Sequence, residues 1–219
     1  MSRPALLDLR GSGFGRADLE PAAAHLARGG VVAYPTDTVY GFGGLCTPSG
    51  VSRVRRLKGR PDEQPFLILV RGPEDAAGLR WPDEARSLAS AFWPGSLTLV
   101  LADPDHIFPD GVRSKVGAVA ARVSPHPLVA TLLELLAAPL TSTSANAPGE
   151  PPSLTGPEAL DAAMRLGAGD EMLVLDGGRL PPSGPSTIVD CTGSVPIVVR
   201  EGSVPLSRLR CALPEIHGH

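Results

Sequence analysis

Two short motifs near the start of the sequence combine residue types that bind anions. PTDTVYGFG (35–43) contains Thr38, and KGRP (58–61) contains Lys58 and Arg60. Cationic groups neutralise phosphate or carboxylate oxygens, and hydroxyls supply neutral hydrogen bonds to them. We therefore expect a site for an anionic substrate here. An ordinary turn between a strand and a helix uses similar residues and is the alternative interpretation.

The first motif is predicted to form a loop at the end of a strand. The apolar residues Val31 to Ala33 indicate a buried strand, and Pro35 has no N–H with which to continue a central ladder. Glycines within residues 41–44 would let the backbone approach a ligand closely. Loops held by a scaffold carry binding and catalytic residues more often than core segments do.

The lysine of the second motif is unusual for this chain. Lys58 and Lys115 are the only lysines among 20 lysines and arginines. A lysine beside Arg60 suggests a need for a compact ammonium group, which binds phosphate as a point charge. For the arginines within 53–56, a solvated helix face is an equally good interpretation.

Polar residues also lie beside apolar runs at three later places in the sequence. The ends of strands in α/β sheets form a common ligand-binding crevice, so residues that are distant in sequence can meet there. Turn and surface positions are the alternative for each cluster taken alone. The candidate residues in these clusters are Arg122, Ser142, Ser144, Asn146, Ser186 and Arg200.

Helical and strand-like segments alternate through the first half of the sequence and predict the elements that position these residues. Helices are expected over 18–28, 49–57 with Ser49 as N-cap, 73–78, 83–92, 127–136 and 157–165. Strands are expected over 31–33, 66–70, 97–102, 117–123, from 140, and over 172–175, 187–190 and 197–199. Residues 147–156 are rich in proline and glycine and predict a loop. Three strands close together after residue 171 indicate a mixed sheet, so we predict one α/β domain over residues 1–219 with helices flanking the sheet.

Composition narrows the possible functions. No apolar run approaches the ~20 residues that span a bilayer, so we expect a soluble, cytoplasmic protein without a membrane partner. The three cysteines, at 46, 191 and 211, have no metal-ligand spacing and support neither a disulfide framework nor a metal site. The net charge of −3 argues against a broad surface for duplex nucleic acid.

Common catalytic signatures are missing from the sequence. It has no G-x-x-x-x-G-K-[ST] loop, no G-x-G-x-x-G after a strand and no G-x-S-x-G elbow. No covalent nucleophile is indicated. Hydroxyls and cations without a nucleophile are typical of phosphoryl or nucleotidyl transfer, in which positioning and charge stabilisation carry the catalysis.

Five motifs, in order along the chain, resemble those of the YrdC-type threonylcarbamoyl-AMP synthases. They are PTDTVYGFG (35–43), KGRP (58–61), VAARVSPHP (119–127), STSANAPGEPPS (142–153) and PSTIVD…VVREG (185–202). The resemblance covers about residues 18–204 and implies an α/β sandwich around a twisted mixed sheet with a concave, basic groove. Members of this family condense L-threonine, bicarbonate and ATP into threonylcarbamoyl-AMP and pyrophosphate. This is the first step in making the threonylcarbamoyl-adenosine of tRNA, so tRNA or a downstream threonylcarbamoyl-transferase complex is a possible partner.

The resemblance also implies roles for the candidate residues. Thr38, Arg122, Ser142 and Ser186 would surround threonine and its carboxylate, whereas Lys58, Arg60, Ser144, Asn146 and Arg200 would face ATP. Lys58 and Arg60 would be catalytic because they neutralise the phosphates as pyrophosphate leaves. Mg²⁺ would be held mainly by ATP oxygens, since the sequence shows no carboxylate cluster.

Two residues depart from the pattern of the family, and two other functions are alternatives to the one that the resemblance implies. Leu69 stands where some relatives carry a histidine that touches threonine, and Ala118 stands where a threonine or serine often precedes the arginine strand. The sequence ends soon after Val204, so we expect the short, single-domain form of the family. The alternatives are a non-catalytic RNA-binding protein, disfavoured by few aromatics and the net charge, and a carbamoyltransferase module that handles a carbamoyl-adenylate.

Overall fold

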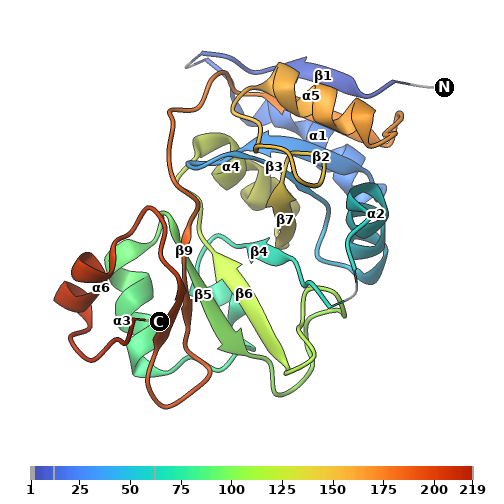
Figure 1. Cartoon of the computed structure of the whole chain (residues 1–219). Coiled ribbons are helices and arrows are strands. Elements are labelled where there is room, and N and C mark those ends of the chain that lie inside the picture. The colour runs from blue at the N-terminus through green and yellow to red at the C-terminus, as the bar shows by residue number, and fades with distance from the viewer. Residues whose placement is uncertain (1–2, 12, 62, 219) are drawn as a thin grey trace.

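A single ten-stranded sheet forms the framework of the protein (Figure 1). The computed structural model describes residues 3–11, 13–61 and 63–218. Its strands lie in the order β1-β8-β2-β3-β7-β4-β6-β5-β9-β10. Their bounds are β1 (Ala5–Asp8), β2 (Val31–Pro35), β3 (Tyr40–Gly43), β4 (Leu67–Leu69), β5 (Leu97–Ala102), β6 (Ala118–Arg122), β7 (Leu140–Ser144), β8 (Met172–Asp176), β9 (Thr187–Asp190) and β10 (Ile197–Arg200).

The sheet is mixed, as the sequence predicts. β1 and β2 both pair with β8 in parallel, whereas β3 pairs antiparallel with β2 and with β7. β4 and β6 are parallel neighbours, and β5 pairs antiparallel with β6 but parallel with β9. The α/β class with a mixed sheet flanked by helices is therefore confirmed.

Helices cover the sheet and create two apolar cores. Their bounds are α1 (Arg16–Ala27), α2 (Pro48–Lys58), α3 (Asp83–Phe92), α4 (Pro127–Leu136), α5 (Gly156–Arg165) and α6 (Leu206–Ala212), with a 3₁₀ helix at Pro73–Ala76. Successive side chains of β2 point to opposite faces. Val32 and Tyr34 join the core under α1 and α4, and Val31 and Ala33 join the core that includes α5. The apolar run of β2 is thus buried on both faces, as its composition indicates.

The first motif forms a loop at residues 36–39, as predicted, but Pro35 still belongs to β2 and Tyr40–Gly43 forms β3 rather than loop, so that part of the prediction is wrong. Only residues 36–39 lie between β2 and β3, and Tyr40 is already the register partner of Pro35. Gly43 is needed inside β3 because an added Cβ would come within 2.1 Å of the Thr141 carbonyl oxygen. Gly41 does line the cavity described below.

The N-cap of α2 is Thr47 and not Ser49. The Thr47 hydroxyl accepts a hydrogen bond of 3.2 Å from the backbone N–H of Gly50. Pro48 follows at the first helical position, where its missing N–H costs nothing. Gly59 ends the helix in the left-handed conformation, with φ of 57°, and so places Lys58 in the last turn.

Two elements at the ends of the chain have no prediction in the sequence analysis. β1 is an edge strand with mostly exposed residues, so it lacks the buried apolar run that indicates a strand. α6 has seven residues and packs against α3. Among the described residues, no helix combines the length and apolar character needed to cross a membrane.

Candidate functional site

Side chains on one face of the sheet form the floor of a cavity of about 710 Å³. Leu67 of β4 is the register partner of Ser142 in β7, and Leu69 of β4 is that of Arg122 in β6. Register partners project to the same face, so these four side chains lie together. Residues from the segments 151–154 and 182–186 complete the lining.

Most of the predicted site residues meet in this cavity although they are distant in sequence. Those that line it are Thr38, Arg60, Arg122, Ser142, Ser144, Ser186 and Arg200. Among the described residues, arginine is the only charged type in the lining, which favours anions. That the groove as a whole is basic stays a prediction. Lys58 and Asn146 are not part of the lining, but both contact Ser144, which is.

Arg122 is held in a network of buried hydrogen bonds. Its Nε donates to the Gly95 carbonyl oxygen at 3.0 Å and its Nη1 to Thr38 Oγ1 at 3.3 Å. Its Nη2 forms an ion pair with Asp37 Oδ1 at 2.6 Å. Burial lowers the pKa of Arg122 from its ordinary value, and Asp37 opposes that shift. The three hydrogen bonds fix the orientation of the guanidinium group.

A second polar cluster lies at the β5 and β9 side of the cavity. Ser186 Oγ is 3.0 Å from Thr98 Oγ1, and Arg200 Nη2 donates to the Ser186 carbonyl oxygen at 2.8 Å. Thr98 and Ile188 are register partners on the cavity face, and Ile188 is also the partner of Arg200. The cluster can offer hydroxyl groups and one cation to a bound molecule.

Lys58 supports the loop that carries Ser144. Its ammonium group donates hydrogen bonds of 3.0 Å to Ser144 O and to Asn146 Oδ1, and a third to Asn146 O. Ser144 Oγ also donates to Asn146 Oδ1 at 2.6 Å. Burial, aided by the charge of Arg60, lowers the pKa of Lys58 to about 8. Lys58 thus acts on the cavity through the loop at 144–146.

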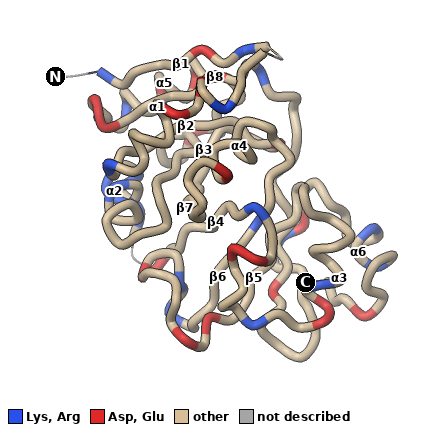
Figure 2. Tube along the Cα trace, turned by 180° about the vertical axis from the view of Figure 1, so that it is seen from behind, with Lys and Arg blue, Asp and Glu red and all other residues tan. Residues whose placement is uncertain are grey.

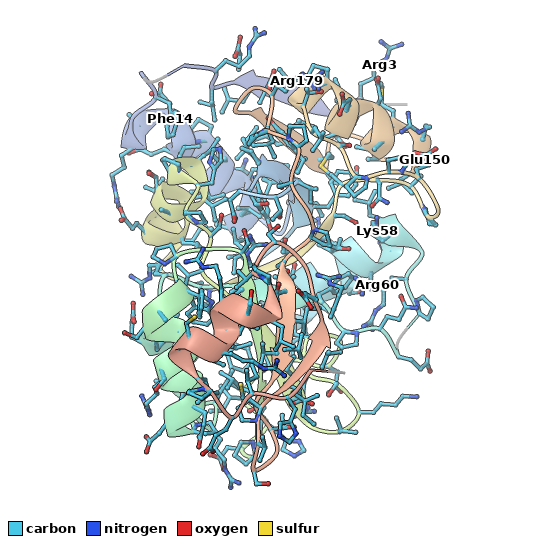
Figure 3. All side chains as sticks on the ribbon, turned by 60° about the vertical axis from the view of Figure 1, so that its left-hand side comes forward. Arg3, Phe14, Lys58, Arg60, Glu150 and Arg179 are labelled. Atoms are coloured by element: carbon cyan, nitrogen blue, oxygen red, sulfur yellow. The ribbon has the colours of Figure 1, made fainter. Side chains whose placement is uncertain are left out.

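Arg60 lies beside Lys58 at the C-terminal end of α2 and reaches the cavity (Figure 3). Its Nη1 donates to Thr143 Oγ1 at 3.2 Å, and its guanidinium carbon lies 5.0 Å from the centre of the Phe66 ring. Among the described residues, its buried Nε has no hydrogen-bond partner. The sequence of α2 contains further cations, Arg53, Arg55 and Arg56, and Figure 2 shows basic positions along this helix. A guanidinium group that lines the cavity is suited to an incoming anion.

The two departures from the family differ in their position. Leu69 is 1% exposed and lines the cavity beside Arg122, so it makes that part of the wall apolar. Ala118 begins β6 and is not part of the lining, whereas Ala120 is. Ala118 projects to the same face of the sheet as Ala120 and Arg122, so a hydroxyl at position 118 would lie on that face but beyond the lining of the cavity.

Three residues near the site have no role in the sequence analysis. Asp37 lies within the first motif and pairs with Arg122, and Thr98 contacts Ser186 from inside an apolar strand. Ser183 Oγ donates to the Thr38 carbonyl oxygen at 3.0 Å. The sequence does contain one sign of Thr98: it is a single polar residue within the apolar strand β5, at a position that faces the cavity.

The fold and these motifs define a family. The sequence model of the Sua5/YciO/YrdC domain, described as "Telomere recombination", matches residues 24–202. The chain belongs to this family, so the predicted resemblance is confirmed.

Several relatives carry the name threonylcarbamoyl-AMP synthase. That of Pyrococcus abyssi is 33% identical over 90% of this chain and 58% of its own length, and that of Bacillus subtilis is 33% identical over 90% and 56%. The chain thus spans less than two thirds of these two relatives. The Stenotrophomonas maltophilia protein is 38% identical over 73% of this chain and 86% of its own length.

Solved structures agree with the architecture. Pyrococcus abyssi Sua5 complexed with L-threonine has a TM-score of 0.89 and 31% identity, covering 98% of this chain and 62% of that one. Escherichia coli YciO has a TM-score of 0.79 and 26% identity, covering 95% and 100%. HypF, with 17% identity and a TM-score of 0.72, shares the fold.

Proposed function

We propose that the protein is an L-threonylcarbamoyladenylate synthase that condenses L-threonine, bicarbonate and ATP into threonylcarbamoyl-AMP and pyrophosphate. One observation carries this proposal: the cavity joins Arg122, a partner for a carboxylate, to Arg60 and Arg200, which can bind phosphates. The names of the relatives and the threonine complex of Pyrococcus abyssi Sua5 support it. The volume lies within the range of small-molecule sites, about 300–1,000 Å³.

L-Threonine is proposed to bind around Arg122. Its carboxylate would accept hydrogen bonds from the guanidinium group, because planar arginine and carboxylate groups match in geometry. Hydroxyls of Thr38, Ser142 and Ser186 would bind the polar atoms of the amino acid. Leu69 would contact its methyl group in place of a polar side chain.

ATP is proposed to occupy the side of the cavity with Arg60, Ser144 and Arg200. Arg60 would bind phosphate oxygens through its guanidinium group, which lines the cavity, and the loop that carries Ser144 would border them, supported by Lys58 and Asn146. Arg200 would contact the nucleotide from the edge of β10. These charges favour the transition state more than the substrate as negative charge moves onto the leaving group.

The reaction is proposed to proceed without a covalent enzyme intermediate. The threonine amine and bicarbonate give a carbamate with loss of water, and a carbamate oxygen then forms a bond to the α-phosphorus. The bond from that phosphorus to the β-phosphate oxygen breaks, and pyrophosphate leaves with the electron pair. The enzyme supplies orientation and charge neutralisation, which Lys58 and Arg60 provide near the leaving group.

Mg²⁺ is proposed to arrive on the nucleotide. Among the residues that the structure describes, no group of three metal-ligating side chains occurs, and no carboxylate lines the cavity. This donor set fits an ion held by phosphate oxygens, with Ser144 as a candidate hydroxyl ligand. When bound, the ion would neutralise charge on the phosphates.

The product is proposed to serve tRNA modification, with transfer to tRNA by a downstream complex. A test of the reaction uses ¹³C-bicarbonate, L-threonine and Mg-ATP with product analysis by mass spectrometry. We expect one labelled carbon in threonylcarbamoyl-AMP. Formation of ADP with orthophosphate, or a product without the label, would contradict the proposal.

A further inference from the structure

Asp37 lies at the tip of the β2–β3 hairpin, and its backbone is held by its neighbours. The Thr36 hydroxyl accepts hydrogen bonds from the N–H groups of Thr38 and Val39, both at 3.2 Å, and donates to the Val39 carbonyl oxygen at 2.7 Å. These hydrogen bonds hold the backbone of the turn around Asp37. The hairpin thereby places the Asp37 carboxylate within reach of its partners.

The Asp37 carboxylate joins three segments that are far apart in sequence. Oδ1 accepts from Arg122 Nη2 at 2.6 Å and from Ser124 Oγ at 3.3 Å, and Oδ2 accepts from Ser96 Oγ at 2.5 Å. The side chains of Asp37 and Arg122 are 17% and 5% exposed. Both carboxylate oxygens are thus used by the protein, and Asp37 is not part of the cavity lining.

The hydrogen bonds that Arg122 donates to the protein use only some of its N–H groups. A guanidinium group has five N–H donors. One goes to Gly95 O, one to Thr38 Oγ1 and one to Asp37 Oδ1. Two donors remain, which is the number that a carboxylate accepts in a bidentate pair.

We propose that Asp37 is a positioning residue: it holds the Arg122 guanidinium group so that the two remaining donors face the carboxylate of the amino-acid substrate. The inference rests on the proposed function, because it takes threonine as the ligand of Arg122. Stability alone gives a weaker explanation, since a buried ion pair adds little over apolar packing of similar volume. Charge alone predicts the opposite effect, because a carboxylate beside Arg122 repels the substrate carboxylate.

The variant Asp37→Asn distinguishes the three explanations, which are positioning of Arg122, stability and charge. The amide keeps the size and one oxygen acceptor but loses the charge and the second acceptor. Asp75→Asn is the matched control, because Asp75 pairs with Arg71 outside the cavity and its side chain is 6% exposed. L-Threonine and ATP affinities would be measured by calorimetry, together with the melting temperature and KM and kcat.

A positioning role predicts that Asp37→Asn weakens L-threonine binding about ten- to a hundredfold, the effect of a small misplacement. ATP affinity should stay within about twofold, and the preference for L- over D-threonine should fall. Asp75→Asn should leave both affinities unchanged. Unchanged or tighter threonine binding in Asp37→Asn would overturn the inference, and so would equal losses for threonine and ATP that follow the melting temperature.

A readout without substrate separates this inference from the proposed function. In ¹⁵N-arginine-labelled protein, the Arg122 side chain should give guanidinium NMR signals of a slowly rotating group, identified by their loss in Arg122→Lys. We expect Asp37→Asn to average these signals and Asp75→Asn to preserve them. If wild-type protein bound no threonine while this averaging occurred, the proposed function would fail and the positioning of Arg122 would stand. Signals that stay unchanged in Asp37→Asn would overturn the positioning role.

Discussion

The Lys58 ammonium group donates a hydrogen bond of 3.0 Å to the carbonyl oxygen of Ser144, a residue 86 positions later in the chain. Two further acceptors belong to Asn146, so all three protons of the ammonium group point to protein oxygens. Lys58 therefore holds the 144–146 loop against the end of α2.

Removing this support should lower turnover more than ATP affinity. In Lys58→Met we expect kcat to fall about a hundredfold, the usual loss of one charge-stabilising contact, roughly 3 kcal/mol. Steady-state kinetics with varied ATP measures both quantities. Lys115→Met is the control, because Lys115 is an exposed lysine that pairs with Glu63. Equal turnover in Lys58→Met and wild-type protein would make Lys58 a structural cation only.

The low pKa of Lys58, about 8, predicts a pH dependence. Below that pH the ammonium form serves its three acceptors, whereas the neutral amine above it has two protons for them. The kcat should therefore be full below about pH 8 and decline as pH rises through this value. Lys58→Arg keeps a charged group and should remove the decline. A decline of the same midpoint in both proteins would assign it to another group.

The hydroxyls around the cavity predict selection for the threonine side chain. An analogue without the hydroxyl leaves buried polar groups unpaired, which reduces kcat/KM by as much as about 10⁴-fold. We therefore expect 2-aminobutyrate to be a poor substrate in competition assays. Arg122→Ala should also weaken threonine binding, whereas Arg71→Ala should not. Comparable kcat/KM for the two amino acids would contradict the assignment of Thr38, Ser142 and Ser186.

The cap of α2 gives a prediction about stability. Thr47→Ala removes the hydroxyl that accepts from Gly50 N and should cost about 1 kcal/mol, or roughly 2–4 °C in Tm. Ser49→Ala should lower Tm less, because Ser49 lies inside the helix and its hydroxyl makes only an exposed contact of 3.2 Å with Thr47 Oγ1. Thermal unfolding of both variants measures the difference. A larger loss for Ser49→Ala would show that the cap is assigned to the wrong residue.

Elements with a strong local pattern could be predicted from the sequence. Pro127–Leu136 and Thr187–Asp190 have the predicted bounds because apolar periodicity and flanking breakers mark them. β3 was missed because its glycines serve close packing against Thr141 and Tyr34, which only the folded neighbours reveal. β1 depends on pairing with β8, a contact across the whole chain.

The composition of the site was easier to predict than its internal contacts. Motifs identified Arg122, Ser142 and Arg60, and strand order brought them together. The pairing of Arg122 with Asp37 could not be predicted, because it depends on the distance between a hairpin tip and the end of another strand. Likewise, no local pattern shows that Lys58 supports a loop rather than facing the cavity directly.

Pyrophosphate release from Mg-ATP, measured in a complete reaction and in reactions that omit one component, tests the proposed synthase activity. We expect release that needs both L-threonine and bicarbonate, with one pyrophosphate for each threonylcarbamoyl-AMP formed. Arg122→Ala should reduce the release, and Arg71→Ala should not. Release that continues without threonine or without bicarbonate, or orthophosphate in place of pyrophosphate, would show that the protein does not catalyse this reaction.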